Sequence, residues 1–304
     1  MTKSAELRRR ELYPAPLIDG RPADAATKRW RRRIDRLRAS RREREEAEVE
    51  RLLAEPPTLS RANVVAVISP KGGVGKTTSA FVVGNLIADR LRLRAVAVDA
   101  NPDFGTLAAL APERVRCERS LADLLSDIES IRTTAELRCY VSTLPSGLHL
   151  LGAPSDAEVM AGLGPDAYGE LLKLLSIFYE LVVLDLGTGV AGPLAQFAIE
   201  RADQVVLVIT PEWVTSTAVL AALDHLHHDR TTVAANKFHA RGAADLHELE
   251  RRLRERRLHR SIAIPHDDQL ATMLDSGTYE LDALERTSRM AIKRLGLAVA
   301  EQLA

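Results

Sequence analysis

Short apolar runs alternate with longer helical segments from residue 62 to the end of the chain. The apolar runs are nearly continuous, which is typical of strands that are covered on both faces. We expect strands at residues 64–69, 95–99, 148–152, 181–185, 204–209, 231–235 and 261–264. We expect helices at residues 76–90, 120–128, 169–178, 193–201, 216–229, 245–258 and 284–303. This alternation predicts an α/β fold, with a mainly parallel sheet and helices on both faces.

Residues 1–60 have a different pattern, with sixteen Lys or Arg against eleven Asp or Glu. A basic stretch, Lys28–Arg44, is followed by an acidic one, Glu45–Glu50. Few apolar residues recur at helical spacing, namely Trp30, Ile34, Leu37, Val49, Leu52 and Leu53. We therefore expect a charged, Arg-rich extension over residues 1–60, helical from about 25 to 53 or partly disordered, before a domain at 61–304. Deleting residues 1–55 is then expected to leave that domain folded.

The function of this extension stays open between four readings. A solvated helix of mixed charge is the simplest, because runs of charge usually face water. The same residues could instead form a nucleic-acid arm, contact an anionic membrane or dock a protein partner. The membrane reading fits less well, because helices that lie in a membrane interface have a broader apolar face.

A glycine-rich loop follows the first expected strand and leads into an apolar helix. Strand, glycine-rich turn and helix N-terminus are together the context that a phosphate-binding loop requires. Glycines at 72, 73 and 75 allow successive backbone N–H groups to face one anion, and the helix start adds its positive end. We expect Lys76 to contact the phosphates and Thr77 to ligate Mg²⁺.

The loop has the sequence KGGVGKTT, with Pro70 where the ordinary phosphate-loop pattern has its first glycine. An additional lysine, Lys71, stands five residues before Lys76. This loop resembles the deviant Walker A motif of the MinD/ParA family of P-loop ATPases. The resemblance implies ATP and Mg²⁺ as cofactors, and a homodimer in which Lys71 reaches the partner's phosphates. The nucleotide-binding residues that it implies in the loop are Lys71, Gly72, Gly73, Val74, Gly75, Lys76, Thr77 and Thr78.

Other segments resemble the same family, in the same order and at strand ends, which is where ligands bind in open α/β sheets. They read VAVDANPD, VVLDLGTG, ITPEW, VAANK and AIPHDDQL. The resemblance implies that Asp185 holds a Mg²⁺-bound water, although a carboxylate at a strand end can also simply cap a loop. It further implies that Asn236 contacts the purine edge and that Pro265 packs on its face.

The chain departs from the family in the first switch segment. Asp99 matches the family's first carboxylate there, but Asn101 stands where a second carboxylate would position or activate the attacking water. A neutral amide cannot accept a proton at pH 7. Asp99, Asn101, Asp185 and Lys71 are therefore the candidate catalytic residues, and we expect ATP to bind but to be hydrolysed slowly. Asp103 is an alternative source of the missing carboxylate.

Two functional readings follow. The first is an ATPase of the positioning or partitioning type, which dimerises with ATP and binds a protein partner or activator. The second is an ATP-bound scaffold or docking protein that does not hydrolyse ATP, serving a secretion or surface-organelle machine. The Arg- and Trp-containing extension also looks like that of ATPases associated with actinobacterial type VII secretion loci. A second basic stretch, Leu249–Arg260, makes nonspecific DNA a further candidate partner.

The composition favours a cytoplasmic protein. No apolar run reaches the roughly 18 residues that a membrane-spanning helix needs. The first residues carry charges with no apolar segment behind them, so no secretory signal is visible. Only Cys117 and Cys139 are present, without CxxC spacing, and this argues against a disulfide framework or a structural zinc site.

Overall fold

The computed structural model describes residues 41–101, 105–210, 226, 230–238, 243–256, 258 and 260–303. Their central element is an eight-stranded sheet in the order β3-β4-β2-β5-β1-β6-β7-β8. Every neighbouring pair is parallel except β3 and β4. The strands are β1 Asn63–Ser69, β2 Ala95–Ala100, β3 Ser142–Thr143, β4 His149–Leu151, β5 Leu181–Thr188, β6 Gln204–Ile209, β7 Thr231–Phe238 and β8 Arg260–Pro265.

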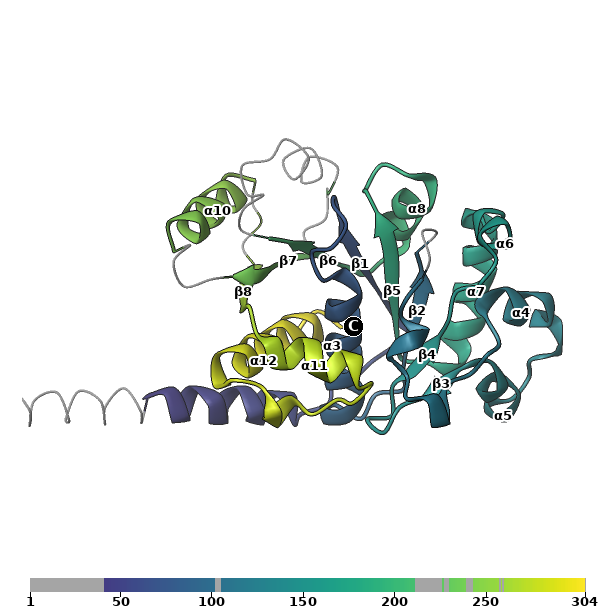
Figure 1. The fold of residues 1–304 in the computed structure, drawn as a ribbon, viewed down its shortest axis with the longest axis horizontal. Coiled ribbons are helices and arrows are strands. Elements are labelled where there is room, and N and C mark those ends of the chain that lie inside the picture. Colours follow the sequence, from purple (N-terminus) through teal and green to yellow (C-terminus); the bar gives the residue numbers. More distant parts are fainter. Residues whose placement is uncertain are drawn as a thin grey trace, which may run out of the picture. The chain divides into compact units, whose positions relative to one another are not determined.

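Helices connect the strands and cover both faces of the sheet (Figure 1). The α-helices are α3 Lys76–Arg90, α4 Leu121–Ser126, α5 Thr134–Leu137, α6 Ala157–Ala161, α7 Pro165–Phe178, α8 Pro193–Arg201, α10 Ala243–Glu255, α11 Asp268–Asp275 and α12 Arg286–Ala300. Short 3₁₀ turns lie at residues 108–110, 113–115, 128–130, 138–140 and 281–283. Within the described residues, no helix has the length and apolar character needed to cross a membrane. The expected α/β fold is confirmed.

The strand order brings three functional segments to one edge of the sheet. β1 lies between β5 and β6, and β2 pairs with the other side of β5. In this register Asp99 of β2 and Val67 of β1 both pair with Asp185 of β5. Because the strands are parallel, the loops that leave their carboxyl ends meet at this edge.

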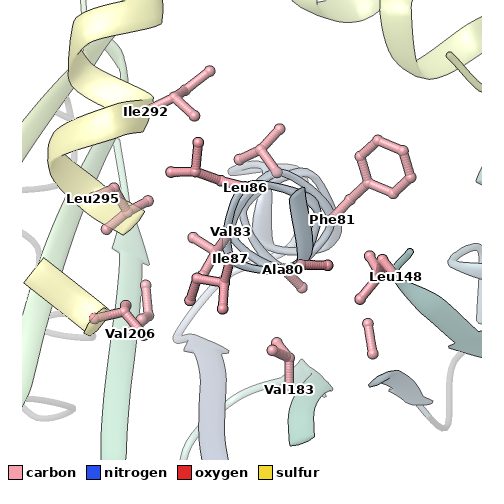
Figure 2. Packing of buried hydrophobic residues seen from close by; sticks show 14 of the residues in the cluster. Ala80, Phe81, Val83, Leu86, Ile87, Leu148, Val183, Val206, Ile292 and Leu295 are labelled. Atoms are coloured by element: carbon pink, nitrogen blue, oxygen red, sulfur yellow. The ribbon is translucent and has the colours of Figure 1, made fainter. Parts of the chain in front are cut away.

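Two apolar layers hold the helices on the sheet. On one face, α3 packs against residues such as Val183 and Val206 of the sheet and is covered in turn by α12 (Figure 2). Leu86 of α3 lies against Gly296 of α12, where any larger side chain would collide with it. On the other face, α4, α7 and α8 bury residues such as Leu171 against the sheet. Since α3 is covered by the sheet below and by α12 above, its first turn is held at the end of β1.

All seven strands expected from the sequence are present, with bounds that differ by at most three residues. The strand β3 was not expected, because two residues carry no readable periodicity. Helix α11 was also missed, since its short stretch was read as part of a nucleotide loop. Helix α7 begins at Pro165, four residues before the expected start, because proline is well suited to a first helical turn. The helix expected at 216–229 lies outside the described residues apart from Leu226.

A helical segment that precedes residue 61 packs with the sheet. Residues 41–53 are helical, and the compact unit that contains the sheet starts at Glu48. Val49 and Leu53 are buried in the apolar layer beneath α3 and α12. Glu50 forms an ion pair with Lys293, whose side chain is only 2% exposed. These contacts give residues 48–53 a place in the domain, whereas the rest of the predicted helix, residues 25–40, lies outside the described residues.

Candidate functional site

The glycine-rich loop borders a cavity of about 550 Å³ at the carboxyl edge of the sheet. The loop itself contributes Lys71, Gly72, Gly73, Gly75, Lys76, Thr77 and Thr78. The remaining walls come from four other segments, with Asn101 and Thr106, Thr188, Asn236 and Lys237, and the run from Pro265 to Leu274. Most of the binding residues expected from the sequence therefore line one cavity. Val74 does not line it, but is buried beneath the loop.

The turn into α3 requires glycine at position 75. Gly75 has a φ of 95° in the left-handed region, which residues with a Cβ rarely adopt. A Cβ at this position would also collide with the side-chain amide of Asn236. Both constraints bring the backbone of the loop directly against the end of β7.

The end of β7 holds the loop through two side chains. Asn236 donates a hydrogen bond from Nδ2 to the carbonyl of Val74 at 2.8 Å. The neighbouring Lys237 donates from Nζ to the carbonyl of Gly73 at 2.7 Å. Lys237 was not expected to act here, although it directly follows Asn236 in the VAANK segment. The family resemblance implies that Asn236 contacts the purine edge of the nucleotide. The structure adds a contact between Asn236 and the phosphate loop.

Lys76 lines the cavity, and Asp185 lies behind it. The Lys76 ammonium is 3.8 Å from Oδ1 of Asp185, and both side chains are buried. Burial raises the pKa of Asp185, while the charge of Lys76 and the Thr77 hydroxyl oppose that rise. Among the described residues, neither carboxylate oxygen of Asp185 has a hydrogen-bond partner. An unsatisfied buried carboxylate beside a threonine hydroxyl fits a hydrated Mg²⁺, because hard cations prefer oxygen ligands and keep several waters.

Asp99 is enclosed by its own loop. Its Oδ2 accepts a hydrogen bond from the Leu107 N–H at 2.9 Å, and its Oδ1 accepts one from the Asn101 N–H at 3.3 Å. Gly105 lies against the same carboxyl group, which has no room for a Cβ there. Burial raises the pKa of Asp99 to about 6, with these backbone hydrogen bonds opposing the rise.

The two candidates of the first switch segment are thus separated by the structure. Asn101 lines the cavity, whereas Asp99 is fully buried and is not among the lining residues. Asp103, the alternative carboxylate, lies outside the described residues. Thr106 and Thr188 were not expected; they reach the cavity from the loop after β2 and from the end of β5. Sequence reasoning also missed the wall from α11, for which the apolar pair Leu270 and Leu274 at helical spacing was the available signal.

Three of the six arginines in the second basic stretch form ion pairs within their own helix, α10. Arg251 and Arg252 both bond to Glu248, at 2.7 and 2.6 Å. Arg254 lies 4.0 Å from Glu250. The paired arginines hold the pKa of Glu248 well below its usual range. This pairing reduces the positive charge that α10 presents to a polyanion.

Comparisons with known proteins agree with this arrangement. A family model described as an AAA domain matches residues 62–235. The chain is 29% identical over 167 residues to the ESX-1 secretion-associated protein EspI of Mycobacterium tuberculosis, covering 54% of this chain and 24% of that protein. It is 29% identical over 187 residues to the antiactivator FleN of Pseudomonas aeruginosa, covering 58% and 62%. The chain thus spans less than two thirds of both relatives.

The fold is also that of a solved relative with a bound nucleotide. The septum site-determining protein MinD of Pyrococcus horikoshii, complexed with Mg-ADP, superposes with a TM-score of 0.61. The match covers 77% of this chain and 94% of that one at 18% identity, so it establishes the fold alone. The family match covers more than half of the chain, and the glycine-rich loop, the buried carboxylates and the sheet order agree with it. The chain therefore belongs to the MinD/ParA family of P-loop ATPases.

Proposed function

We propose that this protein binds ATP with Mg²⁺ in the cavity beside the glycine-rich loop and uses it to control its own dimerisation. The observation that carries the proposal is the combination of that cavity with a buried, unsatisfied Asp185 next to Lys76 and Thr77. Lys76 would contact the phosphates, while Thr77, and Asp185 through water, would hold Mg²⁺. When bound, Mg²⁺ would neutralise charge on the phosphate oxygens.

The dimer is proposed from Lys71. This side chain is exposed at the rim of the cavity, five residues before the buried Lys76. Bringing two nucleotide sites together places like charges close to each other, and a lysine from each protomer would offset that repulsion. Lys71 would therefore contact the phosphates of the partner's nucleotide rather than those of its own.

Hydrolysis is proposed to be slow. Asn101 lines the cavity at the position of the missing carboxylate, and its amide cannot serve as a general base at pH 7. Asp99 is an unsuitable replacement, because both its oxygens accept backbone hydrogen bonds and its side chain is fully buried. We therefore assign Asp99 the role of shaping the loop and not of contacting the attacking water.

The second candidate is an ATP-bound scaffold that docks a protein partner without turnover, and the same placement of Asn101 and Asp99 favours it. The similarity to a protein named as secretion-associated supports a role beside a secretion machine. DNA has less support as a partner, since the arginines at the centre of α10 are paired with glutamates of the same helix. A protein partner or activator therefore stands ahead of DNA.

The test combines binding, sizing and turnover. Wild type, Lys71→Ala and the surface control Lys173→Ala are each mixed with Mg²⁺ and ATP or ADP. Molecular mass is measured at micromolar protein, together with nucleotide affinity and phosphate release. We expect a dimer with ATP for wild type and for the control. Lys71→Ala should bind ATP within a few-fold of wild type but remain a monomer.

The outcomes separate the two candidates. Slow but measurable phosphate release that accompanies loss of the dimer supports the ATPase. A persistent ATP-bound dimer without turnover, alone and with DNA present, supports the scaffold. A wild-type monomer in the presence of Mg²⁺ and ATP would contradict the proposed dimerisation.

A further inference from the structure

Ser69, the last residue of β1, is fully buried and contacts Lys71 through its side chain. Its hydroxyl accepts a hydrogen bond from the Lys71 N–H at 3.2 Å and donates one to the Lys71 carbonyl at 2.7 Å. A single hydroxyl therefore holds both ends of the Lys71 backbone. The direction in which Lys71 leaves the loop depends on this contact.

The backbone of the same serine contacts the segment that follows Asp185. The carbonyl of Ser69 accepts a hydrogen bond from the Gly189 N–H at 2.9 Å. Ser69 also pairs with Thr188, after a shift in the β1–β5 register between Val67 and Ser69. Residues 187–189 belong to the VVLDLGTG segment that resembles the family, and we name them the second switch segment. The shift brings them alongside the start of the glycine-rich loop.

Thr188 also lies close to the glycine-rich loop. Its methyl group is 3.4 Å from the position that a Cβ at Gly72 would occupy. The second switch segment is therefore bonded to the chain before Lys71, at Ser69, and lies near the chain after it, at Gly72. Movement of this segment would act on the Lys71 backbone through the bond to Ser69.

We propose that Ser69 is a positioning residue that couples the second switch segment to Lys71. Its carbonyl is hydrogen-bonded to the segment and its hydroxyl is hydrogen-bonded to the backbone of Lys71. Only two carbon–carbon bonds separate the carbonyl carbon from the carbon that bears the hydroxyl. Lys71 would then reach a partner protomer only when the segment adopts its ATP-bound arrangement. This inference rests on the proposed function, since it assigns a control to the dimer contact made by Lys71.

Ser79 provides a matched comparison within the same region. It is also buried, and its hydroxyl donates to the carbonyl of Gly75 at 2.9 Å. That bond returns to the preceding turn of α3 and contacts neither Lys71 nor the second switch segment. Ser69→Ala removes a hydroxyl that makes two hydrogen bonds and Ser79→Ala one that makes a single bond, so Ser69→Ala should lower the melting temperature somewhat more.

The experiment compares wild type, Ser69→Ala, Ser69→Cys and Ser79→Ala. The dimer dissociation constant is measured with Mg²⁺ and a non-hydrolysable ATP analogue, together with ADP affinity and melting temperature. We expect Ser69→Ala to weaken the dimer at least tenfold relative to Ser79→Ala, while its ADP affinity matches that of Ser79→Ala and both proteins remain folded at the temperature of the measurement. Ser69→Cys keeps a side chain of similar size with a weaker hydrogen-bond donor, so we expect it to weaken the dimer by an intermediate amount. If Ser69→Ala does not fold, Ser69→Cys provides the test.

Two results would count against the proposal in distinguishable ways. If wild type dimerises and both Ser69 variants dimerise within twofold of Ser79→Ala, the coupling is wrong and the proposed function stands. If wild type remains a monomer with the analogue, both the proposed function and the coupling are wrong. A dimer weakened equally by Ser69→Ala and Ser79→Ala would assign Ser69 a role in folding alone and overturn the coupling.

Discussion

The Asn236 side chain donates its hydrogen bond to the Val74 carbonyl across 162 residues of chain, which joins the end of β7 to the glycine-rich loop. The adjacent Lys237 does the same for Gly73, from an exposed position. The two bonds therefore connect one pair of segments in different environments. Their difference in burial decides how much each should matter.

Asn236→Ala is expected to weaken nucleotide binding more than Lys237→Ala. Losing a buried hydrogen-bonding group costs about 1–3 kcal/mol, or roughly 5- to 150-fold in affinity, whereas a solvent-exposed bond is worth less. Affinity for a fluorescent ADP analogue measures both. Equal effects of the two substitutions would mean that burial of Asn236 is not what stabilises the loop.

Asn101→Asp is expected to accelerate hydrolysis at least tenfold. Help from a general base is typically worth ~10²–10⁴-fold, and aspartate has nearly the shape of asparagine. The added negative charge near the phosphates opposes part of that gain. Steady-state phosphate release provides the measurement, with the exposed Ser130→Asp as a control for an added carboxylate away from the cavity. A wild type that is already fast would show that another group supplies the base.

Removing residues 1–47 is expected to leave the domain stable, whereas removing residues 1–55 should destabilise it. The longer deletion takes away Val49 and Leu53, which are 8% and 1% exposed, and each buried side chain of this size contributes about 1.5–3 kcal/mol. It also removes Glu50, the partner of the buried Lys293. Urea unfolding of both truncated proteins measures the difference. Equal midpoints would mean that residues 48–53 contribute nothing to stability.

Acid is expected to destabilise the fold through His149. Burial lowers its pKa from 6.5 to about 4, and its Nδ1 lies 2.7 Å from the Tyr179 hydroxyl. Between these two values the unfolded chain binds a proton that the folded chain does not. Stability is therefore lost as the pH falls from about 6.5 to about 4, by about 3 kcal/mol at 1.36 kcal/mol per pKa unit.

The measurement is the free energy of unfolding of wild type and His149→Gln across this pH range. Asp99 acts in the opposite direction, because its pKa is raised from 3.8 to about 6 and the folded state binds more protons between those values. Both proteins share that contribution, so their difference isolates His149. Parallel pH profiles would exclude His149 as the acid-sensitive group.

The strands and the phosphate loop were predictable because their signals are local. A buried parallel strand is a continuous apolar run, and the turn into α3 needs glycine whatever the rest of the chain does. The burial of Asp99 was not predictable, because it depends on a loop that folds back to bring the Leu107 N–H and Gly105 onto the carboxyl. Sequence motifs place Asp99 and Asn101 side by side, and the tertiary structure separates them.

The packing of residues 48–53 was not predictable for a similar reason. Val49 and Leu53 are among the few apolar residues of a highly charged segment, and the sequence does not reveal that both are buried in the same apolar layer as α3 and α12. Likewise, Glu250 and Glu255 are visible within the second basic stretch and dilute its charge, but Glu248, which pairs with Arg251 and Arg252, lies just before it. Pair formation at i,i+3 and i,i+4 positions is the rule that applies to this pairing.

Helix α3 connects the phosphate loop with the N-terminal segment that contains Glu50. Its first residue, Lys76, belongs to the phosphate loop, and its last, Arg90, lies 4.0 Å from Glu50 of the segment that leads into the domain. A helix of this length extends about 22 Å at 1.5 Å per residue, and α3 is packed along that length between the sheet and α12. The helix is therefore a rigid rod, and any displacement of its first turn would be carried to the place where the N-terminal segment enters the domain.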